Sequence, residues 1–263
     1  MTSEPAPSRL PAAPFGPKRA FLIFGTSLIA QLIVGILGGL AIAIYERPAS
    51  DRNYQGFESH ASAFPKDNPA IFPIAIIGIL LGLYAAFRMA RRDFPGPLRN
   101  GAMAALGWKP CTRSQLIISI FAGCMIALFN VTFVLPIFPP GPHNHLGALA
   151  EAASASGLNA ILFSVIIVFV APPSEEFIFR GVLYTGLLRK WDQATAMISV
   201  SVLFVALHLF EVIGYLPALI GISMLAGGTI IARQRTGTLA APLSLHMAYN
   251  GIVALFAHGL LWR

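Results

Sequence analysis

Charge is scarce in this chain. Of its 263 residues only 11% are Asp, Glu, Lys or Arg, whereas soluble domains contain about 25%. Hydrophobic residues make up 56% of the sequence, and the mean hydropathy is +0.71. The composition excludes an ordinary soluble domain. It predicts an all-α, polytopic membrane protein whose core is a bundle of helices in lipid.

Cysteine and acidic residues are also few. Cys111 and Cys124 do not have metal-ligand spacing, and we expect no disulfide between them. We see no internal repeat of the kind found in many transporters. The net charge is +7, but the basic residues lie between the apolar segments. This distribution is typical of cytoplasmic loops, so we expect the lipid bilayer and no nucleic acid as a partner.

Apolar segments predict about seven crossings, since each crossing needs about 20 residues. The expected crossings are residues 20–45, 69–87, 114–138, 158–190, 193–210, 213–232 and 239–261. The fourth segment is too long for one straight crossing and too short for two. Pro172 and Pro173 predict a kink in it, with Ser174 as the N-cap of a new helical turn. Counting the kinked segment as two helices gives about eight.

Three regions follow from this pattern. Residues 1–19 are rich in proline and predict a disordered cytoplasmic tail. Residues 20–157 are expected to form N-terminal membrane helices and loops, and residues 158–263 a second membrane domain that contains the polar groups described next. Most of the 18 basic residues, with Arg233 and Arg235 in a basic turn, fall in loops on the side of the N-terminus. The positive-inside rule therefore predicts a cytoplasmic N-terminus, and we expect a bacterial plasma membrane.

A cluster of ionisable residues lies within the fourth segment. Glu175, Glu176 and Arg180 occur within six residues of one another, and a charge at mid-bilayer costs about 2.5–3.5 kcal/mol on insertion scales. Such groups mark a functional site by default. Glu176 and Arg180 are four residues apart, so they share a helix face and are expected to pair. Glu175 points about 100° away and is expected to be free for chemistry.

Two later segments bring polar groups to the same depth. Phe204 and His208 share one helix face, and His246 and Asn250 share another. With a rise of about 1.5 Å per residue, Glu175, His208 and Asn250 lie about 21, 22 and 17 Å from the inner ends of their helices. We therefore expect three helices to deliver a carboxylate, two histidines and an amide to one layer.

This set of groups suits hydrolysis. Glu175 is predicted to deprotonate water, with His208 orienting the water or sharing its proton. His246 and Asn250 are predicted to donate hydrogen bonds to a developing oxyanion. No Ser or Cys within a crossing stands beside a plausible base, which argues against an acyl-enzyme. Alternatively, Glu175, His208 and His246 could bind zinc, although the sequence lacks the His-Glu-x-x-His spacing of zincins.

The motifs Glu175-Glu176-x-x-x-Arg180, Phe204-x-x-x-His208 and His246-x-x-x-Asn250, in this order, resemble the CAAX protease and bacteriocin-processing (CPBP) family. These proteins are intramembrane endopeptidases and include the type II CAAX prenyl proteases. The resemblance covers about residues 158–255 and makes residues 158–263 a CPBP-type catalytic domain. It implies catalytic roles for Glu175, His208, His246 and Asn250, with Glu176, Arg180 and Phe204 in support.

The resemblance implies an endopeptidase that cuts a membrane-anchored or lipidated protein or peptide. The family is usually labelled metalloprotease, and a metal-free glutamate mechanism is also argued for it, so zinc and no metal are both open. Two rival hypotheses are a non-catalytic immunity or regulatory membrane protein on the same scaffold and a transporter that uses the polar layer as an ion path. Removal of Glu175 separates them, because only the protease requires this carboxylate.

Overall fold

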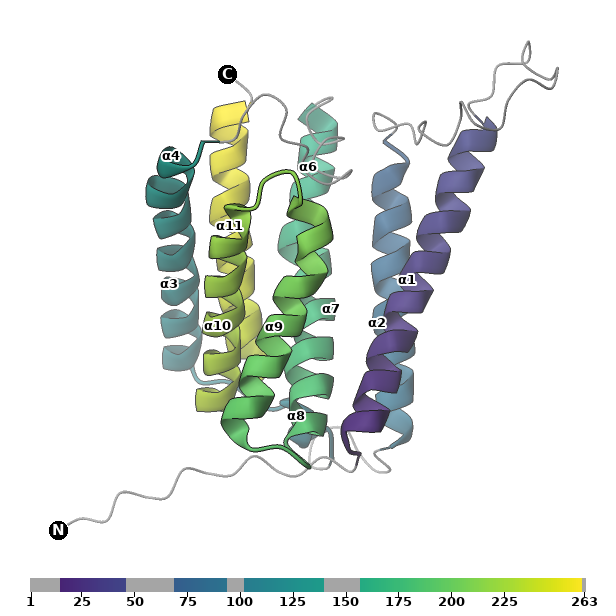
Figure 1. Ribbon diagram of the computed structural model, residues 1–263, viewed down its shortest axis with the longest axis vertical. Coiled ribbons are helices and arrows are strands. Elements are labelled where there is room, and N and C mark those ends of the chain that lie inside the picture. The colour runs from purple at the N-terminus through teal and green to yellow at the C-terminus, as the bar shows by residue number, and fades with distance from the viewer. Residues whose placement is uncertain (1–14, 46–68, 94–101, 140–156, 262–263) are drawn as a thin grey trace.

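The structure is a computed structural model that describes residues 15–45, 69–93, 102–139 and 157–261. The regular structure in these ranges is helical, and no strand occurs among them. Most of the predicted N-terminal tail lies outside the described residues. The chain forms a polytopic bundle of long, roughly aligned helices (Figure 1), as its composition predicts.

Two helices, α1 (Pro17–Tyr45) and α2 (Ile71–Arg92), form one flank of the bundle. The other flank contains α3 (Arg113–Phe129), which continues through the π-helical η4 (Asn130–Val134) into α4 (Leu135–Ile137). A short 3-10 turn, η3 (Ala102–Leu106), precedes α3. The chain then enters the central helix, Gly157–Leu187, and ends with α9 (Gln193–Val212), α10 (Ala218–Thr236) and α11 (Ala240–Leu261).

Five of the described helices are long and apolar enough to cross a membrane: Pro17–Tyr45, Ile71–Arg92, Arg113–Ile137, Gly157–Leu187 and Ala240–Ala257. The sequence predicted about seven crossings. The difference lies in α9, whose apolar stretch is shorter, and in α10, whose last turn contains two arginines. Both helices lie alongside the others in Figure 1. Large apolar side chains face outward, among them Leu37, Ile118 and Leu255, as expected of helices in lipid.

Basic residues gather at one end of the bundle, where α1, α3 and α11 begin and α2 and α10 end (Figure 1). There Arg19 of α1 forms a 2.9 Å salt bridge with Asp93 at the end of α2. The Thr112 hydroxyl accepts a hydrogen bond from the backbone N–H of Gln115 and caps α3 at the same end. The clustering agrees with the expected asymmetry, while the side of the membrane that this end faces stays a prediction.

The central helix consists of five segments in succession. They are α6 (Gly157–Val165), the π-helical η5 (Ile166–Val170), α7 (Ala171–Glu176), the π-helical η6 (Phe177–Leu183) and α8 (Tyr184–Leu187). The prediction that Ser174 caps a new helix is wrong, since Ser174 lies buried inside α7. Pro172 lies in the first positions of α7, directly after a π-helical segment. The central helix nevertheless continues past both prolines as far as Leu187.

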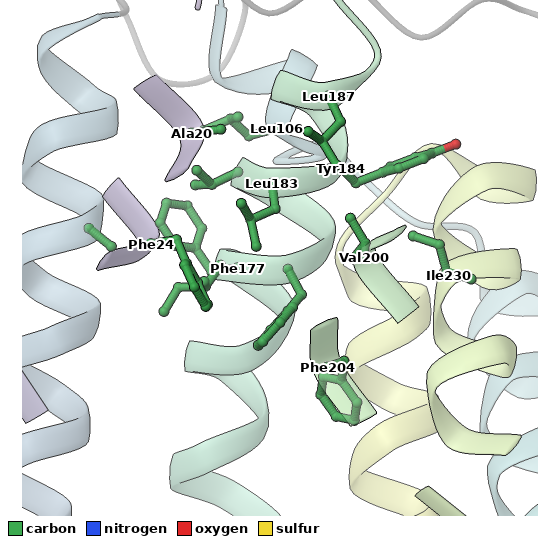
Figure 2. Close-up of a cluster of buried hydrophobic side chains, with 14 of the residues drawn as sticks. Ala20, Phe24, Leu106, Phe177, Leu183, Tyr184, Leu187, Val200, Phe204 and Ile230 are labelled. Atoms are coloured by element: carbon green, nitrogen blue, oxygen red, sulfur yellow. The ribbon is translucent and has the colours of Figure 1, made fainter. Parts of the chain in front are cut away.

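The core is built around the last half of this helix. Every residue of η6 is buried. Figure 2 shows Phe24 of α1 on one side of the central helix, and Phe204 of α9 and Ile230 of α10 on the other. Because α7 and η6 contain the ionisable cluster, this packing surrounds the charged residues with apolar side chains from at least three other helices.

Candidate active site

Three helices supply the predicted site residues. Glu175 and Glu176 end α7, and Arg180 lies one turn later in η6. The other predicted residues come from two helices that pack beside the central one: Phe204 and His208 from α9, and His246 and Asn250 from α11.

Glu176 is the most connected of these groups. Its Oε1 accepts a hydrogen bond from Arg180 Nη1 at 3.2 Å and lies 2.8 Å from His246 Nδ1. All three residues are buried, with exposed fractions of 2% or less. The pair between Glu176 and Arg180 is the one that the four-residue spacing predicts. The contact with His246 joins residues 70 positions apart, and no local spacing indicates it.

Glu175 lies on the other side of the same histidine. Its Oε2 is 3.7 Å from His246 Nε2, and its side chain is 26% exposed. Within the described ranges this oxygen has no hydrogen-bond partner. His246 therefore bridges the two glutamates, with Nδ1 toward Glu176 and Nε2 toward Glu175. When a carboxylate holds one nitrogen of an imidazole ring, the orientation of the ring, and so of its other nitrogen, is fixed.

His208 and Phe204 complete the cluster on α9. His208 Nδ1 lies 2.8 Å from the Phe204 carbonyl oxygen, which can only accept, so Nδ1 bears a proton, and in the neutral ring Nε2 is then an acceptor. The fully buried Phe204 ring packs against His208 at 4.4 Å and His246 at 6.0 Å between centroids. Arg180 Cζ lies 4.5 Å from the centre of the same ring, in cation–π range. One aromatic ring thus separates and positions three polar residues.

The side-chain amide of Asn250 is hydrogen-bonded to the backbone of the central helix. Its Nδ2 donates to the carbonyl oxygen of Ile167 at 2.6 Å. Ile167 lies five residues before Pro172, and in a π-helical segment the N–H five residues on would be its donor. Proline has no N–H. The amide of Asn250 therefore supplies the hydrogen bond that Pro172 cannot make, a contact that sequence spacing does not indicate.

Residues 157–252 match a family model described as type II CAAX prenyl endopeptidase Rce1-like. This segment is related to the CPBP proteases. Curated proteins give no match, and solved structures give none either. At the level of the family, the match supports a CAAX-protease-like intramembrane endopeptidase, and it contains all the predicted site residues.

A zinc ion does not fit the CPBP-related segment as the structure arranges it. The suggested ligands were Glu175, His208 and His246. Among the described residues, no group of three or more His, Cys, Asp or Glu side chains is placed to hold a metal ion.

An apolar pocket of about 700 Å³ borders the cluster. Glu176 contributes a carboxylate to its wall, beside Pro173 and Phe177 of the CPBP-related segment. The remaining wall comes from α2, the turn before α3 and the start of α11: Leu80, Leu83, Tyr84, Phe87, Gly107, Trp108, Lys109, Pro110, Leu239, Ala240 and Leu243. The pocket is therefore built largely from residues outside the matched segment.

Sequence reasoning missed three polar residues at or near the site. Thr229 accepts a hydrogen bond from Arg180 Nη2, which also donates to the Ala226 carbonyl oxygen at 3.3 Å. Glu211 follows His208 by three residues and interacts electrostatically with both His208 and Glu175. The helical spacing after His208 is a signal that could have indicated Glu211.

Arg233 is the third of these residues. The sequence places it in a basic turn at the cytoplasmic border, and it lies in the last turn of α10, but its burial was not foreseen. Its exposed fraction is 0%, and it donates to the Arg180 carbonyl oxygen at 3.0 Å. Position at the end of a helix suggests exposure, but the turn of residues 102–107 packs against Arg233 and excludes solvent.

Proposed function

We propose that this chain is an intramembrane endopeptidase that hydrolyses a peptide bond in a membrane-anchored or lipidated protein through water activated by Glu175. The observation that supports it most is the arrangement of His246 between two glutamates, beside an apolar pocket. A structural ion pair alone requires Glu176 and Arg180. It gives no reason for a second carboxylate, Glu175, at the same depth.

Glu175 is the general base in this proposal. Its side chain is 26% exposed, so the carboxylate can take a proton from water, although the Oε2 atom itself is buried beside His246. His208 presents Nε2 as an acceptor and orients the same water. After the water oxygen attacks the carbonyl carbon, Glu175 returns the proton to the departing amine nitrogen as the C–N bond breaks.

His246 is the donor to the oxyanion. It can donate from Nε2 only when the ring has both protons, and the flanking Glu175 and Glu176 are counterions for that form. Glu176 is a positioning residue, since it holds Nδ1 of His246 and is itself held by Arg180. Asn250 is the second donor. One hydrogen of its amide is already bonded to Ile167, which leaves the other for the oxyanion.

The pocket accommodates the apolar part of the substrate. Its lining is almost entirely hydrophobic, and Glu176 is part of its wall. An apolar group bound there lies against Glu176, the neighbour of Glu175 in the chain, and displaces water from that side of the cluster. Exclusion of water strengthens the electrostatic interactions with the transition state.

The test is a comparison of newly formed protein termini in membranes that contain wild-type protein or Glu175→Ala at equal abundance. We expect at least one terminus, next to an apolar or lipidated segment of a membrane protein, to be present with wild type and absent with the variant. Glu175→Gln should behave in the same way. Identical sets of termini in both membranes would contradict the proposal and favour the non-catalytic hypothesis.

A further inference from the structure

The buried guanidinium of Arg233 has no function in the mechanism above. Its Nε donates to the Arg180 carbonyl oxygen at 3.0 Å, and its Nη2 donates to the Ala105 carbonyl oxygen at 2.9 Å. Each of these hydrogen bonds goes to a backbone carbonyl. Burying a charge is costly. Arg233 thus joins the end of α10 to two other elements: the catalytic part of the central helix and the 3-10 turn η3.

The backbone at Gly107 packs directly against this guanidinium. It has a φ of 89°, a left-handed conformation that favours glycine. A Cβ atom at this position would lie only 2.9 Å from Arg233 Cζ. On its other side, the Gly107 carbonyl oxygen accepts a hydrogen bond from the Leu239 amide at 2.9 Å, just before α11 begins. The turn is therefore fixed between Arg233 and α11.

The same turn forms part of the wall of the pocket. Gly107, Trp108, Lys109 and Pro110 line it, and we call residues 107–110 the pocket turn. The Trp108 ring lies 6.2 Å from Phe87 of α2, which in turn lies 6.1 Å from Phe177 of η6. The pocket turn thus contacts α2 through Trp108 and the residue before α11 through Gly107, although it lies outside the segment that matches the CPBP proteases.

We propose that the pocket turn determines which apolar group of a substrate is accepted, and that Arg233 is the positioning residue that holds this turn against the catalytic helix. The inference rests on the proposed function for the existence of a cleaved substrate. In this proposal residues 157–252 supply the hydrolytic groups, and a turn from the N-terminal half of the chain selects the substrate. The selected group is apolar, because Trp108, Pro110 and the facing α2 side chains offer apolar contact.

Kinetics of the Glu175-dependent cleavage test the selection. Arg233→Lys keeps the charge, but an ammonium lacks the planar fork that reaches two carbonyls. Gly107→Ala disturbs the same contact from the other side. Loss of one charge-assisted hydrogen bond corresponds to about a tenfold effect, so KM should rise about that much in both variants, with kcat nearly unchanged. Arg235→Lys, an exposed neighbour in the same helical turn, is the matched control. A fall in kcat with unchanged KM would overturn the inference.

A measurement without turnover tests the positioning by itself. In a background of Trp191→Phe and Trp262→Phe, Trp108 is the remaining tryptophan, and brominated lipids in phosphatidylcholine vesicles report its contact with the bilayer. Quenching should increase in Arg233→Lys and Gly107→Ala but not in Arg235→Lys. Unchanged quenching in both variants would refute the positioning role. Changed quenching in a protein that cleaves nothing would instead mean that the proposed function fails while Arg233 still holds the turn.

Discussion

Glu175 and Glu176 are adjacent in the sequence, and they should fail in different ways when each is replaced by glutamine. Glu176 Oε1 accepts hydrogen bonds from both Arg180 Nη1 and His246 Nδ1, and all three residues are buried. Glu176→Gln keeps the shape of the side chain but removes its charge, so the buried Arg180 loses its anionic partner. Breaking a buried ion pair costs about 3–5 kcal/mol. Arg180 keeps its bonds to Thr229 and Ala226, so we expect about 3 kcal/mol.

Glu175→Gln should have the opposite result. Its Oε2 is 3.7 Å from His246 and has no hydrogen-bond partner among the described residues, so the substitution removes one charge from the bilayer and a long ionic contact but breaks no hydrogen bond. We expect stability equal to or above that of wild type, with no turnover. Glu176→Gln should retain some turnover per folded molecule, reduced because His246 loses its anionic partner.

The assay is thermal unfolding in detergent beside cleavage per folded molecule. The double variant Glu176→Gln with Arg180→Met removes both charges and should recover part of the lost stability. Arg180→Ala, which strands Glu176, should be as unstable as Glu176→Gln. If Glu175→Gln proves the unstable protein and Glu176→Gln the inactive one, the two roles are exchanged and the reasoning from the contacts is refuted.

Three further predictions concern the histidines, Asn250 and the topology. His208→Ala and His246→Ala should insert normally and each lose about 10²–10³ in rate; near-wild-type cleavage by either would remove that histidine from the site. Asn250→Ala should lower the rate less than Glu175→Ala and should also destabilise by about 1–3 kcal/mol, because the Ile167 carbonyl loses its donor; unchanged thermal stability would contradict this structural role. A periplasmic-type reporter after Arg263 should be active and one between Arg92 and Arg99 silent; the reverse would place the N-terminus outside.

The contacts that sequence could predict are the local ones. A four-residue spacing is enough to pair Glu176 with Arg180, and helical phase is enough to put Phe204 beside His208. The contact of Glu176 with His246 depends on how α11 packs against α7, which no spacing gives. The shared depth of the histidines could be expected from helix length, because a bilayer aligns helix ends.

The wrong N-cap at Ser174 and the unforeseen burial of Arg233 have physical causes. Ser174 follows two prolines and is a good N-cap, but the helix continues through the prolines, because Asn250 of α11 supplies the hydrogen bond that Pro172 cannot make. Arg233 ends a helix near other basic residues, which usually means exposure. It is buried because the turn around Gly107 closes over it. Both outcomes depend on tertiary contacts that a single sequence does not encode locally.

The hydrogen bond from Asn250 to Ile167 also has a consequence for how the protein is made. The central helix is synthesised before α11, so it must enter the bilayer with the Ile167 carbonyl unsatisfied, at a cost of several kcal/mol in lipid. The cost disappears only when α11 docks and delivers its amide. Docking of α11 also brings His246 between the two glutamates. Docking of α11 would therefore satisfy the central helix and complete the proposed catalytic arrangement together.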